Sequence, residues 1–424
     1  MKISRIEKHV FINNNEMMNI CHLSKNLYNY GLFITRQLYF GILDNIPEEL
    51  LSKLNYRYDK YNAKIKYYID KNLLINYLTK SDNIDYRSIP AQSAQQTIIL
   101  LYKNWKSYFQ SLKEYFKDPK KFKNKPKPPK YKKKNGYFVC IFPGQNLRIN
   151  DNGYLRFPKK TNIKPIKTLV DSKQLQHVRV VPHYGHTTIE IVYEKENNYE
   201  NFNLDNDLYM SIDLGINNLI TTSNNAGLKP FIINGKIVKS INQYFNKKKA
   251  KLQSYVGNDD TSKKLEKLHA KRKFKIEDYF HKTSKYIIDY CVNNNIKNIV
   301  IGYNQDWKQN ANMGKKNNQK FICIPYLKLI KMIEYKAFDV GIKVICHEEA
   351  YTSKCDALSC EKICKHSEYL GKRLKRGLFQ SGCGKIINSD INGALNILRK
   401  VIGDVFIENQ LIEGLVFNPL RIDI

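Results

Sequence analysis

Asp213 is a candidate catalytic or metal-binding residue because it interrupts an otherwise apolar segment. It lies in LYMSIDLGI, whose composition is typical of a buried strand. A carboxylate inside such a strand costs on the order of several kcal/mol unless a partner compensates its charge. A metal ion would compensate it. The alternative is an aspartate that caps the turn after the strand.

Further acids occur near the C-terminus. Asp390 stands in INSDINGALNILRK, where the pattern predicts the start of a helix, and Glu348 and Glu349 end the predicted strand Gly341 to Tyr351. Carboxylates that meet at one point repel each other unless cations bind. Two Mg²⁺ ions about 4 Å apart can activate a water and stabilise the leaving oxygen in phosphodiester hydrolysis. Successive strand side chains face opposite sides, so only one of the two glutamates can face such ions.

The elements that carry these acids follow one another in the order of an RNase H-like domain, a mixed sheet covered by helices. Three antiparallel strands are predicted between Leu208 and Gly235, separated by turns rich in Asn and Gly. The elements predicted after them are helices at Ser240–Tyr255 and Ser262–Cys291, a strand at Lys297–Tyr303, a helix at Pro325–Val340, the strand that ends in the glutamates, and the last helix. In this order the first strand lies centrally, and Asp390 can approach Asp213.

The charge of the chain indicates a polyanionic partner. Among 424 residues, Lys plus Arg outnumber Asp plus Glu by 71 to 39, a net charge of +32. Such an excess favours nucleic acid, with a membrane surface as the lesser alternative. No apolar run approaches the ~20 residues of a membrane span, and we expect no membrane partner. The N-terminus does not resemble a signal peptide, and the nine Cys, mostly scattered, suit a reducing compartment.

The N-terminal half is predicted to combine helices with β structure. Lys2 to Phe11 resembles a strand, a helical period begins near Met18, and weaker helical patterns run from Tyr56 to Lys80. A strong helix follows Pro90, and we expect its apolar stripe to belong to the core rather than to stack on bases: Ile98, Leu101, Trp105, Tyr108 and Leu112. A hairpin is predicted at Val178 to Tyr193, and a domain boundary in the polar stretch Glu194 to Asp207.

A basic connector runs from Lys120 to Lys134, with nine Lys, three Pro and no acid. The prolines exclude a helix, and the charge excludes burial. The connector is either a solvated linker or a strip that follows a phosphate backbone. The interleaved Phe122 and Tyr131 favour the second interpretation. The candidate nucleic-acid contacts are Lys125, Lys127, Lys130, Lys132 and Lys133.

Four motifs of the C-terminal half resemble the RuvC motifs of TnpB, a transposon-associated RNA-guided nuclease related to Fanzor and to compact type V CRISPR effectors. They are MSIDLGINNLITTS, IVIGYNQDWKQNANMGKKNNQKFICIPY, EEAYTSK and INSDINGALNILRK. The N-terminal half is similar to TnpB as well, in SKNLYNYGLFITRQ, IPAQSAQQTIILLYKNWKSYF and PKPPKYKKK. The resemblance therefore covers essentially the whole chain.

The resemblance implies an α+β and α/β multidomain protein. A wedge β domain, a split barrel of the oligonucleotide-binding type, would comprise residues 1–15 and 135–205. A helical recognition lobe with the basic connector would span 16–134. A RuvC nuclease domain of RNase H-like fold would comprise 206–352 and 386–424, with an inserted nucleic-acid-binding loop at 353–385.

The activity that the resemblance implies is Mg²⁺-dependent cleavage of double-stranded target DNA. A guide RNA derived from the transposon end would direct it, beside a short transposon-adjacent motif. The expected location is the cytoplasm or nucleoid of a prokaryote, or the nucleus for a eukaryotic or viral homologue. An alternative is a nuclease-inactive, RNA-guided DNA-binding repressor. A guide-free nuclease resembling Holliday-junction resolvase would leave the N-terminal half unexplained.

The chain departs from the family pattern at the third acid. Most relatives carry a catalytic Glu where this chain has Gly302, and Asp306 lies nearby in the following loop. Some relatives supply the acid from the strand before Thr-Ser, three residues ahead of the Thr. Because that Thr is Thr352, the pattern selects Glu349, with Glu348 as the substitute. The implied catalytic metal ligands are then Asp213, Glu349 and Asp390.

A second departure concerns zinc. Relatives often carry two Cys-x-x-Cys pairs, whereas Cys355, Cys360, Cys364 and Cys383 are irregularly spaced here. These cysteines predict either a degenerate Zn²⁺ site or a zinc-free loop held by packing and by the segment Gly371 to Phe379. In that segment Arg373, Lys375 and Arg376 are candidates for phosphate contacts, with plain surface charge as the alternative.

Overall fold

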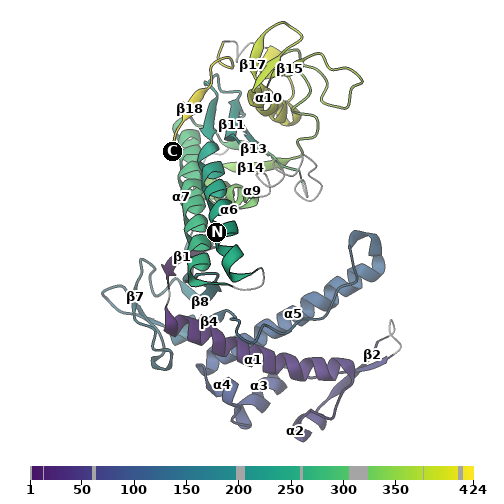
Figure 1. The fold of residues 1–424 in the computed structure, drawn as a ribbon, viewed down its shortest axis with the longest axis vertical. Helices are drawn as coiled ribbons and strands as arrows, with labels where there is room; N and C mark the ends of the chain where they lie inside the picture. Colours follow the sequence, from purple (N-terminus) through teal and green to yellow (C-terminus); the bar gives the residue numbers. More distant parts are fainter. Residues whose placement is uncertain are drawn as a thin grey trace. The chain divides into compact units, whose positions relative to one another are not determined.

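The computed structural model of the chain describes residues 2–12, 14–59, 64–196, 206–257, 261–304, 323–375, 377–408 and 414–424. The chain divides into two compact units, Lys2–Glu196 and Asn197–Ile424 (Figure 1). The division falls in the polar stretch that was predicted as a boundary. None of the described helices combines the length and the hydrophobicity needed to cross a bilayer.

Two long helices form the centre of the N-terminal unit. Helix α1 (Asn15–Phe40) begins at Asn14, whose side chain accepts a hydrogen bond from the Met17 N–H, and ends at Gly41 in the left-handed conformation. Helix α5 (Ala91–Lys117) follows Pro90 and packs against α1. Both helices were predicted. The predicted stripe of α5 is buried, with Trp105 6% and Tyr108 9% exposed.

The β structure of this unit joins segments that are far apart in the sequence. Its main sheet has the order β1-β9-β8-β4 and is antiparallel. The strands are β1 (Lys2–Phe11), β4 (Cys140–Pro143), β8 (Leu175–His183) and β9 (His186–Glu196). A smaller sheet contains β5 (Arg148–Ile149), β6 (Tyr154–Arg156) and β7 (Ile166–Lys167). The N-terminal strand thus pairs with the end of the unit, and the helices are inserted between them.

The weak helical prediction for Tyr56 to Lys80 is wrong in its first part. Residues Asn55–Asp59 (β2) and Lys64–Tyr68 (β3) pair as antiparallel strands, and only Lys71–Lys80 (α3) is helical. The alternation of Tyr with Arg or Lys has period two, which suits a strand rather than a helix. Short helices α2 (Glu48–Leu51) and α4 (Ile84–Arg87) flank these elements.

The C-terminal unit contains a mixed sheet in the order β14-β13-β10-β11-β12-β18. Its strands are β10 (Tyr209–Leu214), β11 (Asn218–Asn224), β12 (Phe231–Asn234), β13 (Asn298–Gly302), β14 (Lys343–His347) and β18 (Leu420–Ile422). Strand β10 is antiparallel to β11 and parallel to β13. The three predicted antiparallel strands and the interior position of the first are confirmed.

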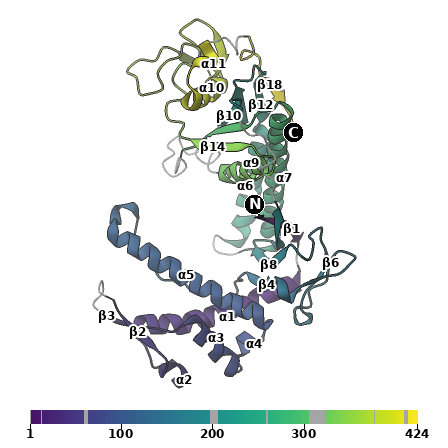
Figure 2. The same ribbon diagram turned by 180° about the vertical axis from the view of Figure 1, so that it is seen from behind.

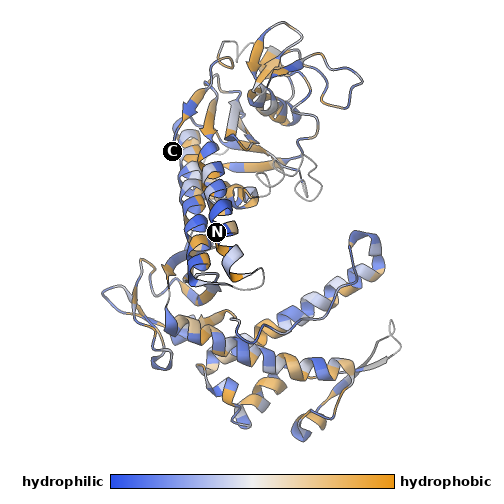
Figure 3. Ribbon diagram, in the orientation of Figure 1, coloured by the Kyte–Doolittle hydropathy of each residue, from blue (hydrophilic) through white to orange (hydrophobic). Residues whose placement is uncertain are grey.

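Helices cover both faces of this sheet (Figures 1 and 2). They are α6 (Lys236–Val256), α7 (Lys263–Asn293), α9 (Tyr326–Asp339) and α10 (Ser389–Ile402). Apolar side chains of α7 and α9 form one core with Met210, Ile212 and Leu214. Figure 3 shows that the sheet is largely hydrophobic, whereas α6 and α7 carry long hydrophilic stretches. Helix α10 packs on β10, β11 and β13, and its apolar side chains form a separate core with Val300.

The segment before α10 forms a small antiparallel sheet of β15 (Lys372–Lys375), β16 (Leu378–Gln380) and β17 (Ile386–Asn388). Strand β17 leads directly into α10, and a short helix α11 (Val405–Glu408) follows. Strand β14 is shorter than predicted, since it ends at His347. Both glutamates therefore lie just beyond the strand.

Candidate metal-binding active site

Asp213 lies near the end of β10 on the face that α10 covers. Because strand side chains alternate, Ser211 and Asp213 point away from the core that holds Met210, Ile212 and Leu214. The Ser211 hydroxyl donates to the Ala394 carbonyl at 2.6 Å and ties α10 to the strand. A Cβ at Gly393 would lie only 3.1 Å from Asp213 Oδ2. The glycine therefore allows the helix backbone to approach the carboxylate closely.

Asp390 lies in the first turn of α10, where the helix dipole favours negative charge. Its backbone N–H donates to the side chain of the N-cap residue Asn388 at 2.9 Å. A residue of the sheet fixes its carboxylate: Asn218 Nδ2 on β11 donates a hydrogen bond to Asp390 Oδ2 at 2.7 Å. Strand β11 and helix α10 thus fix this carboxylate together.

Glu349 reaches the same region from the turn after β14. Its backbone N–H donates to Asn304 Oδ1 at 2.9 Å, and its carbonyl accepts from the Thr352 hydroxyl at 2.8 Å. The Glu349 side chain is partly buried, whereas that of Glu348 is exposed. Lys400 Nζ donates to the Glu348 carbonyl at 2.9 Å. The structure therefore distinguishes the two glutamates: Glu349 faces the interior, and Glu348 does not.

The glycine at position 302 makes room for Glu349. A Cβ built on Gly302 would lie 2.9 Å from Glu349 Oε2 and would overlap Ile397 Cδ1 of α10. The carboxylate of Glu349 thus lies directly against the Gly302 backbone.

The three carboxylates act on one another electrostatically. Burial raises the pKa of Asp213 well above its usual value, and the charges of Glu349 and Asp390 raise it further, while Arg373 acts in the opposite direction. Burial also raises the pKa of Glu349 to about 7, against the opposing charge of Lys400. Two acids with raised pKa values beside a third carboxylate form a site that a cation would stabilise.

The donor set suits a hard divalent cation. All three side chains offer carboxylate oxygens, which Mg²⁺ prefers. Within the described ranges, no three His, Cys, Asp or Glu side chains are close enough to form a ready metal cluster. One oxygen of Asp390 is turned toward Asn218 in this arrangement. The chemistry of the residues therefore fits Mg²⁺, and gathering their oxygens requires side-chain adjustment.

The four candidate zinc ligands are not gathered into one group among the described residues. The thiol of Cys355 is buried and donates to the carbonyls of Lys362 and Cys364. Cys364 Sγ lies 3.3 Å from His366 Nε2. Cys383 is exposed, and its thiol lies 3.1 Å from Ser381 Oγ. Cys360 lies in a turn, with a positive φ of 50°.

Charged side chains hold this cysteine-containing segment in place. Asp356 is fully buried, and its carboxylate accepts from the Ser381 hydroxyl at 2.6 Å and the Gly382 N–H at 2.7 Å. Glu361 accepts from the backbone N–H groups of Asp356 and Leu370. Arg399 of α10 donates to the Glu361 carbonyl at 3.0 Å. Buried charges that are fully hydrogen-bonded can organise a loop.

Asparagines of α10 bind the same segment. Asn392 donates to the Cys355 carbonyl at 2.8 Å and accepts from the Ala357 N–H at 2.9 Å. Asn396 donates to the carbonyls of Thr352 and Cys355. The sequence analysis did not assign these roles, nor those of Asn218 and Asn304. Their only signal was the concentration of Asn around the acidic residues.

The basic connector is fixed along α1. Lys25 Nζ donates to the Lys134 carbonyl, Asn29 exchanges two hydrogen bonds with Lys132, and Arg36 donates to the Pro129 carbonyl at 2.6 Å. Four of the five candidate lysines are exposed: Lys125, Lys127, Lys130 and Lys133. Lys132 is half-buried, with Nζ 5.1 Å from the ring centroids of Tyr28 and Phe138.

Of the three basic residues before α10, Arg373 and Lys375 are exposed on β15. Arg373 is near enough to the site for its charge to act on Asp213. Arg376 and the loop residue Asp306 lie outside the described residues.

Two family models match the chain. A model described as a probable transposase, OrfB_IS605, matches residues 190–308. A second, described as Cas12f1-like, TNB domain, matches residues 326–397. Together these ranges include Asp213, Glu349 and Asp390.

Three relatives share parts of the sequence. A TnpB-like protein of Methanocaldococcus jannaschii is 25% identical over 274 residues, which cover 64% of this chain and 83% of the relative. A TnpB-like protein of Acidianus two-tailed virus is 27% identical, over 46% of this chain and 42% of the relative. The CRISPR-associated endodeoxyribonuclease Cas12f2 of a Micrarchaeota archaeon is 29% identical, over 48% of this chain and 38% of the relative. The chain thus spans less than half the length of the last two.

Solved structures with a similar arrangement include a Cas12f1-sgRNA-target DNA complex and the mini-RNA-guided endonuclease CRISPR-Cas_phi3. The first is 17% identical in sequence and has a TM-score of 0.35. The match covers 93% of this chain and 98% of the chain in that structure. The second is 10% identical and has a TM-score of 0.48, and the match covers 94% of this chain and 92% of the chain in that structure. The family models and the TnpB-like relatives, together with the motifs in the sequence, relate this chain to the TnpB family.

Proposed function

We propose that this chain is an RNA-guided DNA endonuclease whose hydrolytic centre is formed by Asp213, Glu349 and Asp390. The observation that carries the proposal is the approach of these three carboxylates from β10, the turn after β14, and α10, so that the charges of two act on the third. The strand order of the C-terminal unit supports a RuvC domain of RNase H-like fold at 206–352 and 386–424.

Mg²⁺ is the cofactor that we propose for this centre. When bound, Mg²⁺ supplies an activated water and charge stabilisation for phosphodiester hydrolysis. Asp213, Glu349 and Asp390 would hold the ions, and Asn218 and Asn304 would orient two of these ligands. Arg373 would contact a substrate phosphate beside the acids. Zinc in the segment 353–385 remains a separate proposal, on Cys355, Cys360, Cys364 and Cys383.

The remaining regions would bind the nucleic acids. In this proposal residues 1–15 and 135–205 form the wedge domain, 16–134 the recognition lobe, and 353–385 an inserted loop that contacts the target. The pairing of β1 with β9 supports a wedge domain that is split in sequence. The fixed basic connector and the net charge of +32 support binding of a guide RNA and double-stranded target DNA.

The test is cleavage of plasmids by the chain purified with RNA from the DNA that flanks its gene. A library with a matched target and randomised flanking bases should yield linear products only with Mg²⁺, only with the matched target, and only beside one short motif. Asp213→Ala should retain DNA binding and lose cleavage.

Two other results would replace the proposal. Tight binding of matched plasmid without cleavage, at any Mg²⁺ concentration, would assign the chain as an RNA-guided DNA-binding repressor, which Gly302 at the usual position of the Glu favours. Cleavage without RNA would instead indicate a guide-free nuclease.

A further inference from the structure

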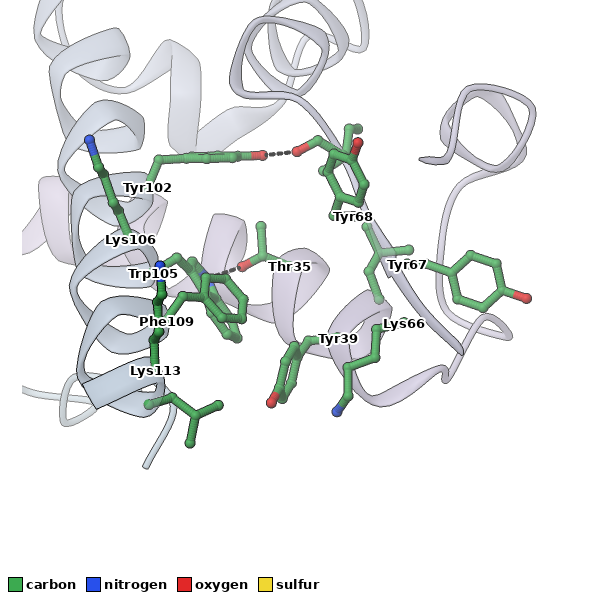
Figure 4. A pocket seen from close by; sticks show the side chains of 13 residues that line it. Thr35, Tyr39, Lys66, Tyr67, Tyr68, Tyr102, Trp105, Lys106, Phe109 and Lys113 are labelled. Atoms are coloured by element: carbon green, nitrogen blue, oxygen red, sulfur yellow. Dashed lines mark hydrogen bonds between the residues drawn. The ribbon is translucent and has the colours of Figure 1, made fainter. Parts of the chain in front are cut away.

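A cavity of about 640 Å³ lies in the N-terminal unit, apart from the three acids (Figure 4). Helix α5 supplies one wall, with Tyr102, Trp105 and Phe109. Strand β3 supplies the opposite wall, and α1 lies between them with Thr35 and Tyr39. The volume is within the range of small-ligand sites, roughly 300–1,000 Å³.

Hydrogen bonds to their polar atoms fix several aromatic side chains of this cavity. Trp105 Nε1 donates to Thr35 Oγ1 at 3.0 Å, and the Tyr102 hydroxyl donates to the Ile69 carbonyl at 2.7 Å. The Tyr39 and Tyr108 hydroxyls are 2.9 Å apart. These bonds fix the rings of Trp105, Tyr102 and Tyr39 and occupy their hydrogen-bonding atoms. What the rings offer to a ligand is therefore mainly π surface, which every nucleobase can stack on.

Phe109 extends this π surface to solvent. Its side chain is 49% exposed, although its ring stacks on Trp105 with centroids 5.6 Å apart and an interplanar angle of 24°. A half-exposed ring fixed on a buried Trp is already positioned for stacking. An unstacked base could stack on the exposed part of the Phe109 ring without a rearrangement of the helix.

All charged residues that line the described cavity are basic: Lys66, Lys106 and Lys113. Lys66 Nζ lies 3.8 Å from the Tyr39 ring centroid, and the other two are exposed on α5. Two acids are next to lining residues in the sequence: Asp70 caps α3 by accepting from the Asn72 N–H, and Glu114 forms an ion pair with Lys117. Aromatic faces beside lysines suit a base and its flanking phosphates, whereas an uncharged apolar ligand would leave the lysines unexplained.

We infer that this cavity captures an unstacked base of single-stranded nucleic acid, with Phe109 stacking on the base, the buried Trp105 supporting Phe109 from behind, and Lys106 and Lys113 contacting adjacent phosphates. The inference shares with the proposed function only the binding of nucleic acid, and it does not depend on cleavage. Since the walls offer mainly π surface, the site would accept bases with little regard to sequence.

Trp105 provides a direct probe, because the chain contains only two Trp. In the full-length Trp307→Phe variant, freed of bound RNA at high salt, the remaining emission comes from Trp105. Titration with a twelve-nucleotide oligo(dT) should quench this emission. An oligonucleotide of equal length with abasic sites throughout has the same phosphates, and it should bind more weakly without quenching.

Phe109→Ala, in the same background, should weaken oligo(dT) binding about tenfold or more, as expected for the loss of one stacking partner. Affinity for the abasic oligonucleotide should be unchanged. Tyr255→Ala, which removes a ring 73% exposed in the other unit, is the matched control and should have no effect. Lys106→Ala should weaken both oligonucleotides alike.

The inference is overturned if oligo(dT) causes no quenching, if the abasic oligonucleotide quenches equally, or if Phe109→Ala leaves oligo(dT) affinity unchanged. The Asp213→Ala variant allows the base site to be tested independently of the proposed nuclease activity. Quenching retained in this variant supports the base site whether or not the wild-type chain cuts plasmids. Cleavage by a chain that shows no quenching would reject the base site alone.

Discussion

The carboxylate of Glu349 lies where a side chain at position 302 would begin. A Cβ on Gly302 would be 2.9 Å from Glu349 Oε2, closer than real Cβ contacts allow. The same Cβ would overlap Ile397 Cδ1 of α10. A side chain at position 302 would therefore force Glu349 and Ile397 to shift from these positions.

Gly302→Ala should reduce cleavage about 100-fold, because a displacement of a catalytic group by about 1 Å has effects of this size. It should also destabilise the fold by about 1–3 kcal/mol through overpacking against Ile397. Plasmid cleavage and thermal unfolding measure the two effects. Adding Ile397→Val removes the overlapping Cδ1, so the double variant should recover stability without recovering cleavage. Recovery of both would show that Gly302 acts only through packing.

Glu349→Gln should reduce cleavage by at least about 100-fold. Loss of a residue that only orients a metal ligand typically costs roughly 10- to 100-fold in activity, and loss of the ligand itself should cost more. Glu348→Gln is the matched control, because its side chain is exposed and its hydrogen bonds with Lys400 and His347 involve its backbone carbonyl. It should cut within about twofold of wild type. Linearisation of matched plasmid at saturating Mg²⁺ measures both. The reverse result would assign the third ligand to Glu348.

Asn218→Ala should raise the Mg²⁺ concentration needed for half-maximal cleavage about 10- to 100-fold, because it removes the amide that orients Asp390. Asn217→Ala is the control, since Asn217 accepts from Lys239 Nζ at 3.2 Å and belongs to the adjacent turn. The stabilisation of each variant by added Mg²⁺ gives a readout independent of turnover. Equal Mg²⁺ dependence in both variants would exclude an orienting role.

Without divalent metal, the chain should lose stability as pH rises from 5 to 8. The pKa of Glu349 is about 7 in the folded chain, above its ordinary value, so the folded state binds the proton more tightly. The stabilisation is complete below the unfolded pKa and disappears as pH rises through 7, with a magnitude of at most about 3 kcal/mol. Asp213 acts in the same direction. Unfolding in EDTA across this range measures the slope.

Glu349→Gln, which does not titrate, should show a smaller decrease in stability over the same pH range. Added Mg²⁺ favours the ionised carboxylates and should restore wild-type stability at pH 8. A pH slope that is identical in the variant and the wild type would show that Glu349 does not titrate in this range.

Glu361→Ala should destabilise the segment 353–385 by about 1–3 kcal/mol, because the buried N–H of Asp356 and the N–H of Leu370 lose their acceptor. Limited proteolysis should then cut within this segment sooner than in wild type. Glu368→Ala, an exposed acid of the same segment, should have no effect. Metal analysis of the purified chain tests zinc separately, with one Zn²⁺ per chain expected if the cysteines bind it.

Elements with a clear periodicity or a marked composition could be predicted from the sequence. The three strands from Tyr209 to Asn234, helix α10 and the buried stripe of α5 each have one dominant pattern. Asp213 and Asp390 stood out because a carboxylate is conspicuous in an apolar strand or at a helix start. The hairpin of β2 and β3 was missed because its two-residue alternation is short and rich in Tyr and Lys.

Features that depend on contacts between distant segments could not be predicted. Nothing in the sequence indicates that Asn218 lies beside Asp390, 172 positions away. The network of Asp356, Glu361 and Arg399 was likewise hidden, because an isolated charged residue normally suggests a surface position. The cysteines drew attention to this segment, while acids and asparagines make most of its hydrogen bonds.

Helix α10 carries Asp390 in its first turn and binds the segment 352–361 through Asn392, Asn396 and Arg399. A Cα atom of a helix lies about 2.3 Å from the axis, so a rotation of roughly 25° displaces it by about 1 Å. A displacement of the segment would therefore also displace Asp390. If the segment binds the target and Asp390 holds a metal ion, as proposed, target binding and metal-ligand geometry are linked through helix α10.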